Sequence, residues 1–193
     1  MNPVTHFLAG WALSLPFSLE RRDRGLVVAA SVAPDLDSLG LVADLARGRP
    51  ADSLDLWSRY HHTLGHNIGF AVLCTALCAI LARRRCLAAL LAFVAIHLHF
   101  VGDIIGARGP DGCQWPIPYL LPFSNCAQLT VRWQWALNAW PNMVLTSGLI
   151  LLTLWFAWRR GISPLGLVSI RADHALVATL RNRFGLPTTT KEQ

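Results

Sequence analysis

Residues 86–107 read CLAALLAFVAIHLHFVGDIIGA and contain one charged side chain, that of Asp103. An apolar stretch of about 18 residues or more with so little charge is long enough to cross a membrane as a helix. Residues 1–19, 60–82 and 133–158 contain no Asp, Glu, Lys or Arg. The whole chain is 53% hydrophobic and 15% charged, whereas a soluble domain has about 25% charged residues. The sequence therefore predicts an integral membrane protein.

The apolar stretches divide the chain into about five membrane segments. We expect an all-α fold, a polytopic transmembrane helix bundle, with segments at residues 4–19, 25–41, 65–82, 86–107 and 141–158, the first of them short and broken near Pro16. Residues 1–158 would form one membrane-embedded domain and residues 159–193 a basic tail. Within the tail, Arg171 to Phe184 is a basic stretch with apolar spacing. It predicts either a helix on the membrane surface or an ordinary solvated helix.

The second segment is interrupted by the motif Pro34-Asp35-Leu36-Asp37. Two carboxylates in apolar sequence indicate either a re-entrant element or a helix that ends at the membrane interface. Asp35 and Asp37 cannot share one face of a helix. A break at Pro34 would let both carboxylates reach a common centre.

Arginine residues gather in alternate connections between the segments. One set of connections, together with the tail, carries 12 of the 17 Lys and Arg residues, among them Arg21, Arg22, Arg24, Arg83, Arg84, Arg85, Arg159 and Arg160. Cytoplasmic loops of membrane proteins are enriched in Lys and Arg. The tail is therefore expected in the cytoplasm and the N-terminus outside. We attribute the net charge of +6 to this topology and expect no nucleic-acid partner.

Ionisable side chains lie in or beside the apolar segments, nearly all toward the ends that this orientation places outside. They are His6, Asp35, Asp37, His61, His62, His66, His97, His99 and Asp103. Ionisable groups inside a membrane are costly and are functional by default. Because the orientation rests on arginine alone, their shared depth is independent support for one site at the outer ends of the helices.

Spacing indicates which of these side chains can act together. His99 and Asp103 are four residues apart and therefore share one helical face, where they can bind the same ion. His62 and His66 have the same spacing. His61 and His66 are five apart, so His61 can contribute only if it precedes the helix. His97 lies on nearly the opposite side of its helix and is expected to be a hydrogen-bonded packing residue.

Mixed imidazole and carboxylate ligands suit zinc, manganese or iron rather than calcium. The candidate ligands are His6, Asp35, Asp37, His61, His66, His99 and Asp103. This set exceeds the needs of one tetrahedral zinc, so we expect one or two divalent ions, with zinc as the first choice. A metal-activated water would be the nucleophile. The candidate catalytic residues, as bridging ligands or proton donors, are Asp35, Asp37, His66 and Asp103.

Two other classes of protein fit part of this pattern. In a haem or metal carrier, histidines on facing helices ligate the cofactor, although haem requires no pair of aspartates. In a membrane interaction protein, the same residues would be the remnant of a degenerate site.

The motifs that carry these residues resemble a known family. Thr5-His6, the Pro34 to Asp37 motif, the pair His61 and His66, and His99-x-x-x-Asp103 are similar to those of the bacterial inner-membrane metal-dependent hydrolases, also described as YdjM-type, LexA-binding and inner-membrane-associated. The resemblance covers about residues 1–125. It favours His61 over His62, because the family's His-Arg-Gly-x-Thr-His-Ser motif aligns with residues 61–67, where only the two histidines match.

The resemblance also implies an activity. The family is distantly similar to zinc-dependent phospholipase C and the P1-type nucleases, which implies phosphoester hydrolysis at the bacterial inner membrane. A site at this depth would take an amphiphilic substrate, such as a phospholipid or a lipid-linked phosphate. Residues 115–123, an apolar, aromatic and Pro-rich stretch, would either shape substrate entry or anchor the chain at the interface.

Two of the five cysteines, Cys113 and Cys126, fall in one external connection of this topology. An oxidising periplasm would favour a disulfide between them.

Overall fold

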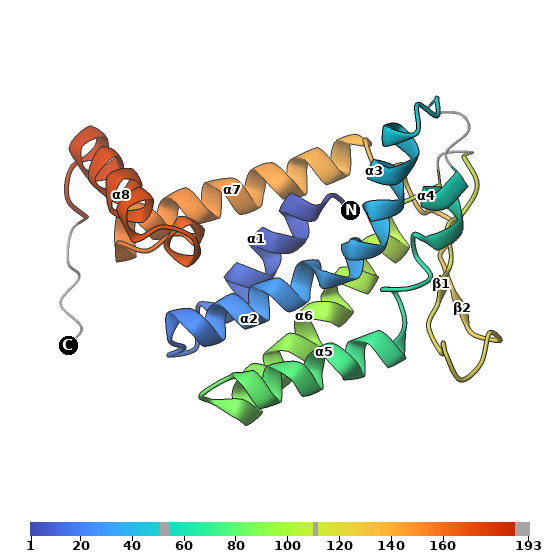
Figure 1. Ribbon diagram of the computed structural model, residues 1–193. Coiled ribbons are helices and arrows are strands. Elements are labelled where there is room, and N and C mark those ends of the chain that lie inside the picture. The colour runs from blue at the N-terminus through green and yellow to red at the C-terminus, as the bar shows by residue number, and fades with distance from the viewer. Residues whose placement is uncertain (51–54, 110–111, 188–193) are drawn as a thin grey trace.

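The computed structural model describes residues 1–50, 55–109 and 112–187, which are mainly helical (Figure 1). Its elements are α1 (Pro3–Ser14), α2 (Arg21–Val32), the 3-10 helix η1 (Ala33–Ser38), α3 (Leu39–Ala46), α4 (Asp55–Tyr60), α5 (Ile68–Leu81), α6 (Arg85–Gly106), β1 (Ile117–Pro118), β2 (Gln128–Leu129), α7 (Trp140–Arg160), the 3-10 helix η2 (Pro164–Leu167) and α8 (Ile170–Phe184).

The long helices lie side by side, and successive ones run in opposite directions (Figure 1). α5 packs on α6, α6 on α2, α2 on α1, and α1 on α7. The core between them is apolar, with Trp11, Val27 and Ile96 almost fully buried. α1 and α2 approach closely at Gly10, where a Cβ atom would lie 2.2 Å from the Ser31 Oγ. This close approach brings the start of α1 beside the end of α2, where the site lies.

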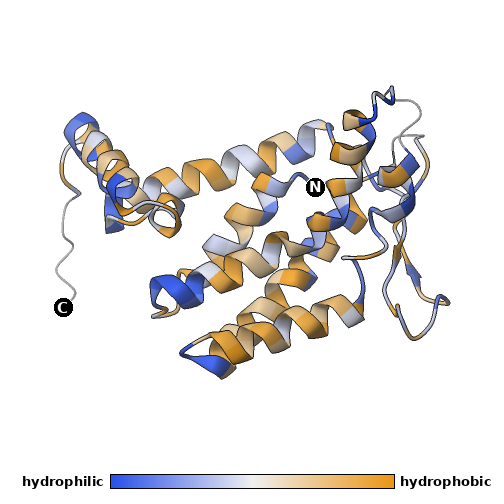
Figure 2. Cartoon of the chain, viewed as in Figure 1, coloured by the Kyte–Doolittle hydropathy of each residue, from blue (hydrophilic) through white to orange (hydrophobic). Residues whose placement is uncertain are grey.

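Three helical stretches are long and apolar enough to cross a membrane: Arg21–Ala46, Arg85–Gly106 and Trp140–Arg160. Crossing requires about 20 residues, whereas α1 has 12 and α5 has 14. Of the five expected spans, three are therefore supported by the length and composition of the helices. In Figure 2 the hydrophobic colour follows the helices, and hydrophilic residues gather at their ends.

The break expected at Pro34 is present. α2 ends at Val32, the chain continues as η1, and α3 begins at Leu39. Proline cannot donate a backbone hydrogen bond, and its ring disfavours an uninterrupted helix. The break turns Asp35 and Asp37 toward different neighbours, which the next subsection describes.

The two ends of the bundle differ in chemistry. The arginines that begin α2, those between α5 and α6, and those that end α7 lie at one end, and α4 with the hairpin of β1 and β2 lies at the other (Figures 1 and 2). At the arginine-rich end, the fully buried Asp23 accepts hydrogen bonds from the backbone N–H groups of Arg83 and Arg84, each at 2.9 Å. Asp23 thereby ties α2 to the turn between α5 and α6.

Replacing Asp23 by alanine is expected to lower the free energy of unfolding by about 2–4 kcal/mol, because the backbone N–H groups of Arg83 and Arg84 would lose a fully buried acceptor. Replacing Asp55, which is exposed on α4, should change it by less than about 0.5 kcal/mol. Unfolding of the purified protein in detergent, followed by circular dichroism, measures both. Equal stability of the two variants would contradict this role of Asp23.

The disulfide predicted between Cys113 and Cys126 is not formed. β1 and β2 pair antiparallel, with Ile117 opposite Leu129. The pairing continues toward the closed end of the hairpin, where the Tyr119 N–H donates to the Ala127 carbonyl at 3.0 Å. Cys126 lies in the loop at this closed end, directly before Ala127, whereas Cys113 precedes β1 at the open end, so the two cysteines lie toward opposite ends of the hairpin.

The basic stretch of the tail forms α8, which packs against η2 and α7. Asp173 accepts hydrogen bonds from the Ser163 N–H and Oγ at 2.8 and 2.6 Å, and the Arg181 Nε donates to the Trp158 carbonyl at 3.1 Å. The last six residues of the expected tail lie outside the described part of the chain.

Candidate metal centre

Four side chains from three parts of the chain converge at the end of the bundle that lies opposite the arginine-rich end. Asp35 comes from η1, His66 from the turn before α5, and His99 and Asp103 from α6. One ligand atom of each lies within 4.8 Å of the others. The two imidazoles and Asp103 are almost completely buried, and Asp35 is half-buried. We call these four residues the central cluster.

Hydrogen bonds fix the tautomers of both imidazoles in the central cluster. The His99 Nδ1 lies 2.8 Å from the Ser31 carbonyl oxygen, and the His66 Nδ1 lies 2.9 Å from the Asp37 Oδ2. Both oxygens only accept, so each Nδ1 carries a proton and donates it. In a neutral ring the Nε2 atom then has a free lone pair, which is the arrangement found in metal-binding histidines with a carbonyl or carboxylate partner.

The lone pairs of the central cluster face one another. The two Nε2 atoms are 3.0 Å apart and lie 3.1 Å (His66) and 2.9 Å (His99) from the Asp103 Oδ2. The Asp35 Oδ1 lies 3.7 Å from the His99 Nε2, and its Oδ2 is shielded from solvent without a hydrogen-bond partner. Buried acceptors without donors are costly. A divalent cation among these atoms would satisfy all of them, so the residues fit a metal ion.

A second group surrounds Asp37. Its Oδ1 lies 2.7 Å from the His61 Nδ1, and its Oδ2 lies 2.9 Å from the His66 Nδ1 and accepts the Gly65 N–H at 3.0 Å. Asp37, His61 and His66 also bring ligand atoms close enough to hold an ion. Both groups use His66, but through different nitrogens, and a neutral imidazole has one lone pair. One neutral ring cannot ligate ions in both groups, and the Asp37 contact suits a residue that orients His66.

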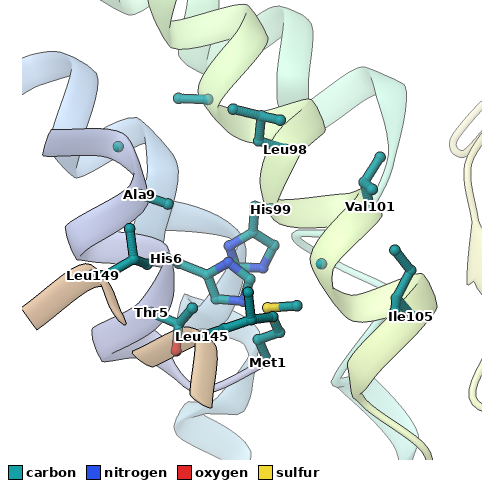
Figure 3. A pocket seen from close by; sticks show the side chains of 13 residues that line it. Met1, Thr5, His6, Ala9, Leu98, His99, Val101, Ile105, Leu145 and Leu149 are labelled. Carbon is teal, nitrogen blue, oxygen red and sulfur yellow. The ribbon is translucent and has the colours of Figure 1, made fainter. Parts of the chain in front are cut away.

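His6 adds a third imidazole beside the central cluster. Its Nε2 lies 3.2 Å from the Asp103 Oδ1, and its ring stacks on that of His99 with centroids 3.6 Å apart (Figure 3). The amino group of Met1 also contacts the Asp103 Oδ1. Both rings line an apolar cavity of about 260 Å³ between α1, α6 and α7, whose wall includes Leu98 and Leu145 (Figure 3). This cavity therefore opens beside the central cluster on an apolar side of the bundle.

His62 belongs to neither group, although its spacing from His66 would suit a helix. α5 begins only at Ile68, so His62 lies in a turn, with a left-handed backbone (φ 65°). It is buried beside Trp115, with ring centroids 4.7 Å apart, and burial lowers its pKa well below the ordinary value. His97 lies away from the cluster and bonds the Phe93 carbonyl and the Tyr119 hydroxyl.

Some residues of the site carry no signal in the sequence. The Ser31 group at the site is a backbone carbonyl, which every residue possesses. The Gln134 Nε2 donates to the Asp103 carbonyl at 2.9 Å from a loop far along the chain. Gly65 could have been noticed beside His66, because glycine is the residue that permits a close approach of the backbone to another group. A Cβ atom there would lie 2.2 Å from the Pro34 carbonyl oxygen.

Replacing Asp37 by asparagine is expected to weaken metal binding about 10- to 100-fold, because an amide orients the His66 ring less strongly than a carboxylate. Replacing the exposed Asp55 should leave the affinity unchanged. Competition with a fluorescent zinc chelator measures both. If the Asp37 variant bound metal as tightly as the unmodified protein, the orienting role would be wrong.

A buried cluster of histidines and aspartates, among helices of which three can cross a membrane, defines the class: a helical membrane protein with a candidate metal centre. The chain belongs to the YdjM inner membrane protein family, whose model matches residues 1–180. This match confirms the resemblance and extends it from about residue 125 into α8. No curated protein and no solved structure matches the chain significantly.

Proposed function

We propose that this protein is a membrane-bound metal-dependent hydrolase that cleaves a phosphoester of a lipid or lipid-linked substrate. The observation that carries the proposal is the central cluster: two imidazoles with lone pairs free and two carboxylates, one with an orphaned buried oxygen, converge on one point. In a non-enzymatic interaction protein, nothing would maintain this costly set of unpaired acceptors.

Asp35, His66, His99 and Asp103 would hold the ion, and zinc suits this mixture of nitrogen and oxygen ligands. A bound divalent ion would polarise the phosphoryl group and lower the pKa of a water molecule. Asp37 holds the His66 ring in the required tautomer. His6 lies beside Asp103 but is not among the four proposed ligands, and we assign it proton transfer to the leaving group.

The apolar cavity beside His6 and His99 supports a lipid substrate. It lies between two candidate membrane spans, α6 and α7, and its wall includes Leu98, Val101 and Leu145, which are 43–50% exposed. In a membrane these side chains would face acyl chains. A lipid could therefore reach the central cluster from within the bilayer, without first leaving it for water.

We further propose that the arginine-rich end faces the cytoplasm and the central cluster the periplasm of a bacterial inner membrane. The positive-inside rule supports this orientation, since the arginine-rich end and the central cluster lie at opposite ends of the bundle. A reporter fused to the C-terminus should be active in the cytoplasm, and one fused after Asn125 should be active outside. Reporters active on the same side would contradict the orientation.

The test of the hydrolase is a direct assay. Full-length protein purified in detergent, with zinc or manganese offered, should retain at least one equivalent of metal and release phosphate or a phosphorylated headgroup from phospholipids presented in mixed micelles. Chelation should abolish turnover, and adding metal back should restore it. Metal without turnover on phosphatidic acid, phosphatidylglycerol or a polyprenyl diphosphate would favour a metal-binding protein without this activity. Absorbance in the Soret region would instead indicate haem.

A further inference from the structure

A second cavity lies on the hairpin side of the central cluster. Its volume is about 440 Å³, and its wall includes Trp57, His61, Arg108, Trp115, Leu137 and Asn138. We call it the Arg108 cavity. It differs from the apolar cavity beside His6, because it combines a cation and an imidazole with two indole rings.

Arg108 is held rigidly at the exit of α6, five residues after Asp103. Its backbone N–H donates to the Trp135 carbonyl at 3.0 Å, and it forms a β-bridge with Ala136. Arg108 is half-buried as a residue, and its Nε atom is shielded from solvent without a hydrogen-bond partner. A buried cationic donor without an acceptor is costly. This cost indicates that a ligand in the cavity, most simply an anion, accepts a hydrogen bond from Arg108.

Hydrogen bonds through Asp37 connect the Arg108 cavity to the central cluster. His61 lines the cavity, and its Nδ1 lies 2.7 Å from one oxygen of Asp37, whose other oxygen holds His66 at 2.9 Å. Because a carboxylate accepts the His61 Nδ1 proton, the Nε2 is the remaining nitrogen of that ring. The imidazole in the cavity and an imidazole of the cluster are therefore oriented by the same carboxylate.

Two tryptophans close the wall around His61. The Trp57 and Trp115 rings meet edge to face with centroids 5.1 Å apart, and the His61 ring lies 5.8 Å from Trp57 and 4.8 Å from Trp115. Such apolar walls exclude water and strengthen an ionic contact made between them. A guanidinium in this setting favours a ligand with two oxygens in one plane, such as a phosphate.

We propose that the Arg108 cavity is a phosphate subsite: Arg108 binds a phosphate group of the substrate beside the metal centre. The inference rests on the proposed function for its substrate, but the binding of phosphate by Arg108 does not require turnover or a metal ion. The phosphate can belong to a soluble ester or to a lipid headgroup, and both present the same oxygens.

The test measures binding by full-length, metal-free protein in a neutral detergent. Calorimetric titration with glycerol 3-phosphate should show saturable binding, which Arg108→Gln should weaken at least about tenfold through the loss of a charge-assisted contact. Arg132→Gln is the matched control, since Arg132 is exposed and outside the cavity wall. It should bind like the unmodified protein. Arg108→Lys keeps the charge without the planar fork and should bind with intermediate affinity.

Nanodiscs distinguish the two sources of phosphate. If a lipid headgroup is the ligand, phosphatidic acid in the disc should displace glycerol 3-phosphate, whereas discs of phosphatidylcholine should not. If a soluble ester is the ligand, both discs should leave the titration unchanged. Either result supports the phosphate subsite.

Two results would overturn the inference: no binding of glycerol 3-phosphate to metal-free protein, or equal affinities of the Arg108→Gln and Arg132→Gln variants. Thermal unfolding and zinc content of the variants show whether the fold is retained. If Arg108-dependent binding is found but no lipid is hydrolysed, the hydrolase proposal fails while the subsite stands. If lipid is hydrolysed with the same kcat/KM after Arg108→Gln, the subsite fails while the hydrolase stands.

Discussion

Replacing Asp103 by asparagine should lower metal affinity by more than about 100-fold, because loss of a direct ligand exceeds the 10- to 100-fold typical of a supporting residue. The Oδ2 of Asp103 lies 3.1 Å from the His66 Nε2 and 2.9 Å from the His99 Nε2, at the centre of the cluster. The proposed hydrolytic turnover should disappear with the metal. Elemental analysis after exposure to zinc and gel filtration measures the metal retained.

The matched control is His97→Gln. His97 lies on the same helix, six residues before Asp103, but its ring nitrogens bond Phe93 and Tyr119. This variant should keep its metal. Asp103→Asn should still insert into membranes, because removing a charge from an apolar helix eases insertion. Full zinc content in the Asp103 variant would show that the central cluster is not the metal site.

Replacing Gly65 by alanine is expected to damage both the fold and the site. The new Cβ atom would lie 2.2 Å from the Pro34 carbonyl oxygen and 2.8 Å from the Pro34 Cα, and both are backbone atoms that cannot rotate away. η1 and the turn before α5 would have to separate, at a cost of about 1–3 kcal/mol or more. The separation would also pull Asp37 away from His66, so metal affinity should fall together with the unfolding temperature.

Gly25→Ala is the control for this variant. Gly25 lies within α2, with no heavy atom within 4 Å of its ideal Cβ position. Alanine there should be neutral or should stabilise the helix by up to about 1 kcal/mol. Thermal unfolding in detergent and a zinc titration of both variants decide the matter. An alanine at residue 65 that left both quantities unchanged would contradict the close contact between η1 and the turn.

The long helices were predictable because their apolar stretches end at strong signals. Residues 86–107 were expected and Arg85–Gly106 is observed, and residues 141–158 were expected and Trp140–Arg160 is observed. The first segment was predicted as residues 4–19 with a break near Pro16, and α1 ends at Ser14, just before that proline. Composition alone could not reveal this end, since Leu15, Phe17 and Leu19 are apolar without being helical. Pro16 was the local signal that predicted this break.

The convergence of the site was predictable, but the role of each member was not. Spacing placed His99 and Asp103 on one face, and they do lie in one cluster. The same rule paired His62 with His66, but it presupposed a helix that begins only at Ile68. The contact that selects the His66 tautomer joins residues 29 apart in the sequence. Contacts across such distances arise from packing between elements, on which local periodicity carries no information.

The loop that contributes Trp115 and Arg108 was the least predictable part. Its strands have two residues each, and Arg108 is positioned by a bridge to Ala136. Residues 115–123 were expected to shape substrate entry or to anchor the chain. The region around Trp135, to which Trp115 bonds through Gln134, carries no pattern that separates it from an ordinary membrane interface.

The order in which the ligands occur along the chain bears on how the protein is made. The central cluster draws on residues 35, 66, 99 and 103, and the last two lie on the distal half of α6. During synthesis the pocket cannot close before α6 has entered the membrane, whereas α7 and α8 provide none of these four ligands. Metal capture would therefore have to follow the insertion of α6 but would not have to await α7 and α8, and it would stabilise α1 to α6 by linking segments that were inserted one after another.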